Sequence, residues 1–273
     1  MLWNTLLLAL RSIRRNLMRS FLTILGIVIG VAAVITMVTL GNGATQAIAD
    51  QVSSLGSNLL IVRPGQRLGP TRDVAGAPNF RLDDAEAIAE EISSVAAVAP
   101  TAGRGVTVIY GAENWSTTVT GSTNAWFETG NWELAGGRLF NEAEERAGKA
   151  VCVIGETIRR ELFGSLPPLG QNLRVKNFSC EVIGLLESKG QSAFGSDQDD
   201  LIVMPLRTVQ RRLTGTQDVS GLRISVKEGY SIDQTKRQVT LLLRERRNIA
   251  ENEDDNFSVL DTRQITETLS STT

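Results

Sequence analysis

The twenty residues from Phe21 to Leu40, FLTILGIVIGVAAVITMVTL, contain no charged side chain. An α-helix rises about 1.5 Å per residue, so about 20 apolar residues are long enough to cross a hydrocarbon core of ~30 Å. We interpret residues 20–43 as a transmembrane helix. Every other part of the chain must then lie on one side of the membrane or the other.

The charges that flank this stretch predict its orientation. Four arginines precede it, and the first charged residue after it is Asp50. The arginines are Arg11, Arg14, Arg15 and Arg19. Positive charge collects on the cytoplasmic side of membrane helices, so we expect a cytoplasmic N-terminus and an outward-facing main domain. A cleavable secretory signal has a shorter apolar region and leader, and residues 12–17 resemble a twin-arginine export signal only loosely.

The segments on either side of the span are also predicted to be helical. Residues 1–19 show the basic amphipathic pattern of a helix that lies in the cytoplasmic interface. Residues 44–57 continue the helical pattern outward as a stalk that ends at Gly56. Within the span, Gly26, Gly30 and Ala33 form a face of small residues, which another helix backbone can approach closely.

The outer part of the chain alternates strands and helices, which predicts an α+β class. Residues 58–123 and 216–262 each contain a β-α-β unit, and we assign both to one split lobe. The first unit includes a hairpin, with strands at residues 106–110 and 115–120. Residues 124–215 read as an inserted, strand-rich lobe with strands at 150–154, 173–175, 180–186 and 201–204. Residues 263–273 are expected to return toward a second membrane helix.

The amino-acid composition argues against several classes of catalytic and binding site. The chain has no histidine and a net charge of −2, so the commonest general base and the basic field that nucleic acid requires are both missing. No phosphate-binding loop occurs, and no cofactor or metal site is predicted. Asp197, Asp199 and Asp200 lack the glycine and terminal glutamate of a calcium loop, and we interpret them as a solvated acidic turn. These observations argue against an enzyme.

The two cysteines, Cys152 and Cys180, leave two interpretations open. In an oxidising compartment they would form one disulfide, which stabilises by about 3 kcal/mol. The alternative is a pair of small, buried, apolar thiols.

Two groups of sequence motifs together cover nearly the whole chain. The first group comprises residues 19–30 (RSFLTILGIVIG), 40–43 (LGNG), 54–58 (SLGSN) and 64–65 (PG). The second group comprises residues 131–134 (NWEL), 136–140 (GGRLF), 153–157 (VIGET), 161–164 (ELFG), 182–186 (VIGLL) and 190–192 (GQS). Taken together, these motifs resemble those of the MacB-type ABC transporter permeases.

The resemblance implies an inner-membrane permease with a two-lobed periplasmic domain. It also implies a homodimer that works with a periplasmic adaptor and a TolC-like outer-membrane duct, driven by cytoplasmic ATP hydrolysis. Because the chain starts almost at the membrane, we expect a separate ATPase subunit, and because it stops near a second span, we expect a longer native chain. The loop around residues 190–200, with Gln191, Phe194 and Asp197, is the predicted partner contact. The alternative is an FtsX-like regulatory protein that controls periplasmic partners without transport.

Overall fold

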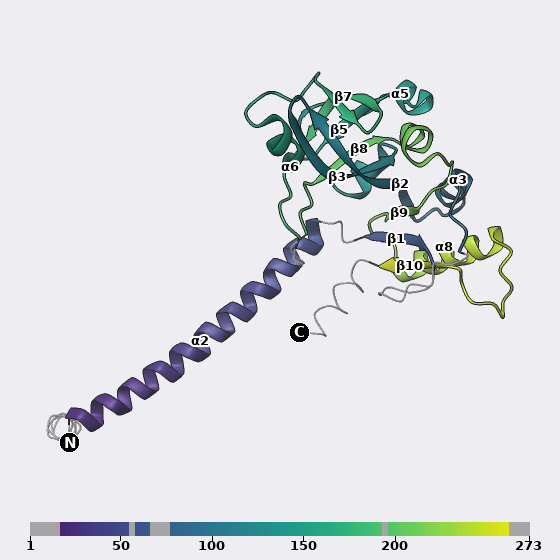
Figure 1. Ribbon diagram of the computed structural model, residues 1–273. Helices are drawn as coiled ribbons and strands as arrows, with labels where there is room; N and C mark the ends of the chain where they lie inside the picture. Colours follow the sequence, from purple (N-terminus) through teal and green to yellow (C-terminus); the bar gives the residue numbers. More distant parts are fainter. Residues whose placement is uncertain (1–16, 55–57, 66–76, 193–195, 262–273) are drawn as a thin grey trace. The chain divides into compact units, whose positions relative to one another are not determined.

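The computed structural model describes residues 17–54, 58–65, 77–192 and 196–261. The chain forms two compact units, residues 1–50 and residues 51–273. In the first unit, helix α2 (Leu17–Ser54) is one continuous helix of 38 residues, which includes the apolar span and part of the segment predicted to form a stalk (Figure 1). The predicted interfacial helix before Leu17, Gly56 and the return segment 263–273 lie outside the described residues.

The second unit is the outer domain, and it mixes strands with short helices, as the sequence predicts. Its strands are β1 (Leu59–Pro64), β2 (Val95–Tyr110), β3 (Glu113–Ser122), β4 (Leu134–Gly137), β5 (Val151–Ile154), β6 (Asn172–Val175), β7 (Phe178–Leu186), β8 (Leu201–Pro205), β9 (Gly221–Val226) and β10 (Phe257–Asp261). Its α-helices are α3 (Leu82–Glu91), α4 (Ala125–Thr129), α5 (Glu142–Ala147), α6 (Glu156–Ile158), α7 (Leu206–Val209) and α8 (Ile232–Arg246). Two π-helical turns, η1 (Arg159–Phe163) and η2 (Gln210–Thr214), extend α6 and α7.

Four strands form what we term the helix-backed sheet, in the order β10-β1-β9-β2 with antiparallel pairing throughout. Buried residues alternate along β9 and β10, as expected when one face of a sheet packs on helices. Leu60 and Ile224 from that face share a hydrophobic core with Ile88 of α3 and Val239 of α8. This packing explains why two segments about 100 residues apart in sequence form one layer.

The remaining strands form a closed ring. Its order is β2-β3-β8-β5-β7-β6, and β6 pairs with both β7 and β2, where Val108 lies opposite Val175. A ring of this kind leaves none of its six strands with an unpaired edge. Strand β4 pairs with β7 outside the ring. We term these six strands the barrel.

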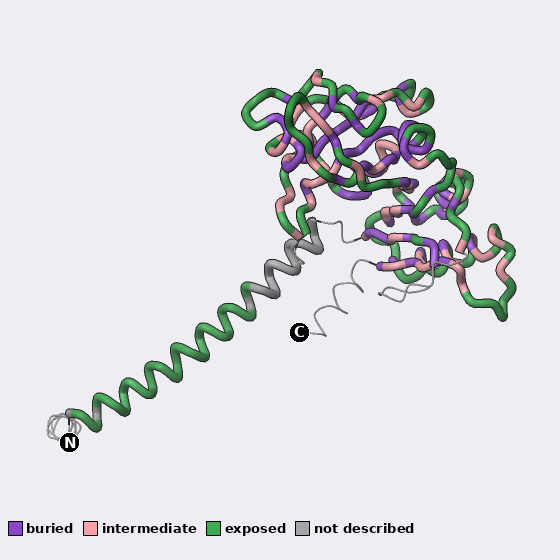
Figure 2. Tube along the Cα trace, viewed as in Figure 1, coloured by how far each residue is buried: buried purple, intermediate pink, exposed green. Residues whose placement is uncertain are grey.

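An apolar core fills the barrel, and buried residues run along its strands (Figure 2). The fully buried members of this core are Val108, Val119, Cys152, Ile154, Leu173, Val175, Cys180, Val182, Ile202 and Met204. The side chains that alternate with them on β5, Val151 and Val153, belong to a second cluster with Trp126 and Phe140. The strands of the barrel are therefore buried on both faces where α4 and the 134–140 segment cover them.

The strand pairing corrects one prediction about the lobes. We placed residues 106–120 in the split lobe, but β3 pairs in parallel with β8, so this hairpin belongs to the barrel. The predicted strand at 106–110 is the end of a longer strand of 16 residues, β2. Its first half pairs with β9 and its second half with β3, so β2 joins the helix-backed sheet to the barrel.

Candidate functional site

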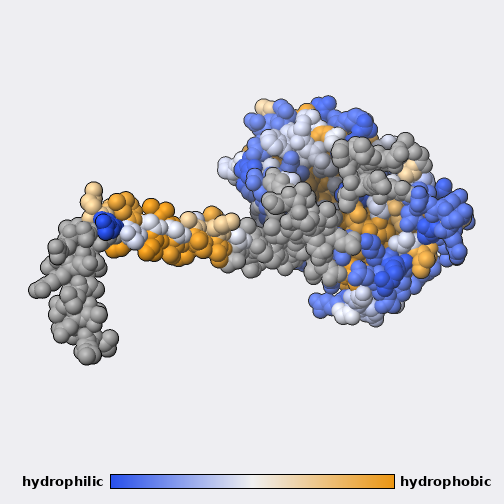
Figure 3. Space-filling view, turned by 90° about the horizontal axis from the view of Figure 1, so that it is seen from below, coloured by the Kyte–Doolittle hydropathy of each residue, from blue (hydrophilic) through white to orange (hydrophobic). Residues whose placement is uncertain are grey.

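The apolar span of α2 is exposed along its whole length. Residues Phe21–Gly41 have a mean hydropathy of 2.7, and the large apolar side chains in this span are exposed (Figure 3). The hydroxyls of Thr23, Thr36 and Thr39 each donate to the carbonyl oxygen four residues earlier, at 2.7 to 2.8 Å. Polar groups in the span are therefore satisfied within the helix, as a hydrocarbon environment requires.

The small-residue face of α2 is open. A Cβ atom added at Gly26 or Gly30 would meet nothing within 4 Å, and Ala33 is exposed. Helix packing on this face stays a prediction. Of the four arginines, Arg19 is exposed, while Arg11, Arg14 and Arg15 lie outside the described residues.

The predicted partner loop is anchored by a buried acid. The Asp199 side chain accepts hydrogen bonds from Ser188 Oγ, from the Lys189 amide at 2.8 Å and from the Gly190 amide at 3.0 Å. Asp199 is only 4% exposed, so our interpretation of a solvated acidic turn was wrong for this residue. Three donors to one carboxylate hold the loop base in place.

Asp197 also has a structural role at the base of this loop. One of its oxygens accepts from Thr157 Oγ1 at 2.6 Å and the other from the Asp199 amide at 2.9 Å. Gln191 is exposed and forms an isolated bridge with Asp197, whereas Phe194 lies outside the described residues. Gln191 is therefore the described side chain of the predicted set that is best placed to meet a partner.

Two glycines from the motifs allow separate segments of the chain to pack closely against each other. A Cβ at Gly155 would lie 2.1 Å from the carbonyl oxygen of Asp199. Gly137, at φ +83°, would place a Cβ 2.2 Å from the carbonyl oxygen of Ile183. A side chain fits at neither position, which gives a physical reason for two of the quoted motifs.

A stack of two aromatic rings between two cations runs from this loop to the helix-backed sheet. The Lys189 ammonium lies 4.4 Å from the centroid of the Trp132 ring, and Trp132 stacks on Trp126 at 5.8 Å. The Arg223 guanidinium on β9 lies 5.3 Å from the Trp126 ring. Such contacts contribute roughly 0.5–2 kcal/mol each. The sequence indicated Trp132 only as part of a motif and gave no signal for Arg223.

Both cations of the stack have lowered pKa values. Burial, followed by the charge of Arg63, lowers the pKa of Arg223 to about 10. Burial and the charge of Arg223 lower the pKa of Lys189, although Asp199 acts in the opposite direction. Arg223 therefore remains charged at neutral pH in a place where water is partly excluded.

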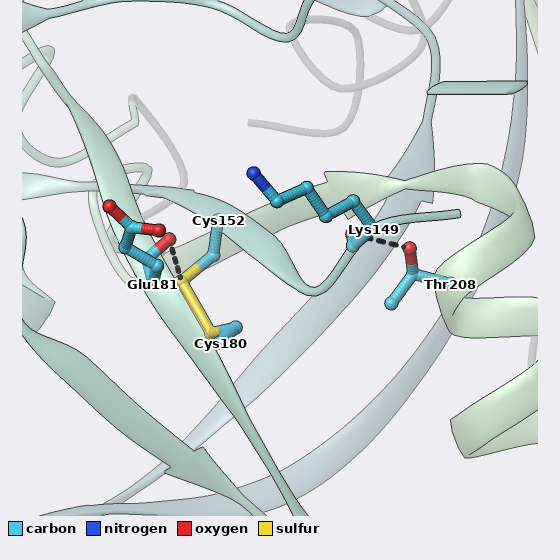
Figure 4. Close-up of a disulfide and its surroundings, with 5 residues drawn as sticks. All are labelled: Lys149, Cys152, Cys180, Glu181 and Thr208. Atoms are coloured by element: carbon cyan, nitrogen blue, oxygen red, sulfur yellow. Dashed lines mark hydrogen bonds between the residues drawn. A yellow bond between two sulfur atoms is a disulfide. The ribbon is translucent and has the colours of Figure 1, made fainter. Parts of the chain in front are cut away.

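Cys152 on β5 and Cys180 on β7 form a disulfide inside the barrel (Figure 4). Their Cα atoms lie 5.9 Å apart, within the range that a disulfide spans. Beside it, Thr208 donates to the carbonyl oxygen of Lys149 at 2.9 Å, which fixes the start of β5. Of the two interpretations that the sequence left open, the structure has the disulfide.

Within the described part of the chain, no group of three or more His, Cys, Asp or Glu residues is placed to hold a metal ion. The main features are an apolar helix, a barrel fused to a helix-backed sheet, and the stack of rings and cations from Lys189 to Arg223. Residues 20–242 match the family of the MacB-like periplasmic core domain. The chain belongs to the MacB-type permease family.

Relatives named macrolide export ATP-binding/permease protein MacB support the assignment. The protein from Rhodospirillum rubrum is 39% identical over 86% of this chain, and the protein from Azoarcus is 37% identical over 95% of it. The chain spans only 36% and 39% of the length of those two relatives.

Solved structures agree on the fold. The periplasmic region of MacB from Actinobacillus actinomycetemcomitans superposes with a TM-score of 0.69 at 20% identity, over 83% of this chain and 99% of that one. The extracellular domain of YknZ, a transporter from Gram-positive bacteria, superposes with a TM-score of 0.60 at 19% identity, over 74% of this chain and all of the other. The apolar helix and the match to a periplasmic domain fit an inner-membrane protein.

Proposed function

We propose that this chain is part of the permease subunit of an ABC exporter. In this proposal a separate ATPase subunit hydrolyses ATP in the cytoplasm, and the permease transmits the resulting movement to its periplasmic domain. The observation that carries the proposal is the family match over residues 20–242, which covers both the apolar helix and most of the outer domain. The match to export proteins favours this function over FtsX-like regulation.

The structure supplies parts suited to mechanical transmission. Helix α2 continues 13 residues beyond the apolar span, from Asn42 to Ser54. A helix is rigid along its axis because every backbone group in its interior is hydrogen-bonded within it. The barrel is likewise rigid, with paired strands and a disulfide between β5 and β7.

The proposal is tested by the ATP turnover of the complex. The native permease, its ATPase and its adaptor are reconstituted in nanodiscs, and turnover is measured as each component is left out. We expect turnover to change when the adaptor is added only if the permease is present. An ATPase that responds to the adaptor without the permease, or ignores the permease altogether, contradicts the proposal.

The orientation is proposed to be N-terminus in the cytoplasm and outer domain in the periplasm, because the arginines precede the span. Both native cysteines are in the disulfide, so a single introduced cysteine reports its own side of the membrane. In spheroplasts, a membrane-impermeant maleimide should label Glu113→Cys, which lies at an exposed position on β3. Leu2→Cys should react only after lysis. The reverse pattern refutes the orientation.

We also propose that the permease acts as a homodimer whose α2 helices contribute to the interface through Gly26 and Gly30. A leucine at Gly30 would push the two backbones apart, whereas a leucine at the exposed Val28, on the opposite face of the helix, leaves them free to approach. Chemical cross-linking in native membranes should show less dimer for Gly30→Leu and wild-type dimer for Val28→Leu. Equal cross-linking in both variants removes this face from the interface.

The adaptor contact is proposed to include the loop at Gln191, and a TolC-like duct would complete the pathway. Gln191→Ala should weaken capture of the adaptor by the full chain because it removes an exposed side chain without touching the loop base. The control is Gln234→Ala, an exposed glutamine on α8. Unchanged capture by Gln191→Ala refutes this contact.

A further inference from the structure

A cleft of about 480 Å³ lies where the helix-backed sheet meets the barrel. Its lining comes from β1, β2, β3, β9, the start of β8, and Trp126 of α4. Arg223 lies opposite Ile61 in the sheet, and Leu222 and Ile224, on either side of it along β9, point into the core with α3 and α8. The cleft is therefore on the face of the sheet that α3 and α8 do not cover. Its volume is in the range of small-molecule sites.

The guanidinium of Arg223 lines this cleft without a counter-ion. Its Nε is buried and has no hydrogen-bond partner, and within the described ranges it makes no ion pair. Ser225, two residues further along the same strand, also has a buried hydroxyl without a partner. Buried charges in proteins are normally paired, so an unpaired guanidinium in a cleft indicates a missing anion.

The surroundings of Arg223 add positive charge. Arg63 also lines the cleft, and its charge together with burial lowers the pKa of Arg223. No carboxylate raises that pKa, and no described acid forms an ion pair with Arg63. An anion bound between the two guanidinium groups would relieve their mutual repulsion and replace the water that Arg223 has lost.

The rest of the lining identifies the kind of anion. Trp126, Ile61 and Leu201 give the cleft apolar walls beside the two arginines. A planar guanidinium binds a carboxylate through two parallel hydrogen bonds. We propose that this cleft binds a small organic carboxylate, with its charged group between Arg63 and Arg223 and its apolar body against Trp126.

The test is isothermal titration calorimetry of the full chain in nanodiscs. The probes are 1-naphthoate, its neutral amide 1-naphthamide, and inorganic phosphate. We expect naphthoate to bind and naphthamide to bind at least about tenfold more weakly, since a hydrogen bond to a charged group contributes roughly 1.5–3 kcal/mol. Binding at this cleft requires neither ATP nor transport, so its outcome is independent of the ATPase test above.

Variants locate the binding. Arg223→Gln should weaken naphthoate at least about tenfold, for the same loss of a charged hydrogen bond. Arg63→Gln should also weaken it, and because Arg63 is exposed this variant decides the matter if Arg223→Gln does not fold. The matched control is Arg174→Gln, an exposed arginine on β6 that does not line the cleft, which should bind like the wild type.

Three results overturn the proposal. The first is no binding of naphthoate to the wild type at millimolar concentration. The second is equal affinity for naphthoate and naphthamide, or equal affinity in the wild type and Arg63→Gln. The third is tighter binding of phosphate than of naphthoate, which would assign the cleft to a phosphate group.

Discussion

Glu144 in α5 allows a stability prediction with a worked magnitude. Its carboxylate accepts two hydrogen bonds from Arg138, at 2.8 and 2.9 Å, and a third from the amide of Asn141 at 3.0 Å. The Glu144 side chain is 5% exposed, while that of Arg138 is half exposed. The bonds from Arg138 are the main cause that lowers the pKa of Glu144 from 4.5 to about 2.

This shift converts into a free energy of unfolding. Each pKa unit corresponds to about 1.4 kcal/mol, so the ionised form of Glu144 stabilises the fold by about 3 kcal/mol relative to the protonated form. Because the folded pKa is the lower one, this stability is present above about pH 4.5 and is lost as the pH falls toward 2. Glu144→Gln should therefore lose about 2–3 kcal/mol at pH 7.

The assay is urea unfolding of the full chain in detergent, followed by tryptophan emission at several pH values. A loss of this size lowers the midpoint by roughly 1 M urea if the slope is about 2–3 kcal/mol/M. The variant should also lose less stability than the wild type between pH 5 and pH 3. The control is Glu142→Gln on the same helix, because the Glu142 side chain is 86% exposed and pairs only weakly with Arg146 at 3.4 Å. Equal midpoints for the two variants would refute the reasoning.

Two further variants test the packing of the barrel, with the same urea midpoint as the readout. Gly155→Ala would force a Cβ to within 2.1 Å of the Asp199 carbonyl oxygen, so we expect a loss of at least about 1–3 kcal/mol, whereas Gly105→Ala, with nothing within 4 Å, should cost less than about 1 kcal/mol. A wild-type midpoint for Gly155→Ala shows that the loop does not approach this strand. Replacing Cys152 and Cys180 together by alanine should cost about 2–4 kcal/mol, and reducing agent should then affect the wild type but not the variant. Reductant that leaves the wild-type midpoint unchanged speaks against the disulfide.

Local features of the fold could be predicted from the sequence. An uncharged run such as Phe21 to Leu40 indicates a spanning helix whatever surrounds it. The strands at 173–175, 180–186 and 201–204 were predicted close to their final bounds, because apolar runs between turn residues mark strands locally.

Closure of the barrel could not be predicted in this way. It depends on Val108 meeting Val175, which lie far apart in sequence, and hydrophobic periodicity does not say which strand pairs with which. For the same reason, the sequence-based prediction placed the β2–β3 hairpin in the wrong lobe. The pairing of β3 with β8 decides its position, and that pairing is a tertiary contact.

The candidate site was even harder to predict from the sequence. Asp199 looks like a surface acid because its neighbours in sequence are polar, and it becomes buried because Ser188 and two backbone amides fold over it. Arg223 lies in a strand whose sequence pattern does not indicate that its buried Nε has no hydrogen-bond partner. Burial of a polar group depends on partners brought from elsewhere in the chain, and one sequence does not identify them.

In the proposed function, ATP hydrolysis in the cytoplasm moves the periplasmic domains. The most direct measurement is the distance between spin labels at Glu113→Cys in the two protomers of the native permease, reconstituted with its ATPase. The disulfide occupies both native cysteines, so the label is confined to this exposed position. We predict that the distance distribution shifts between the nucleotide-free complex and the complex trapped with ADP and vanadate. The same distribution in both states, with the ATPase active, would contradict mechanical coupling.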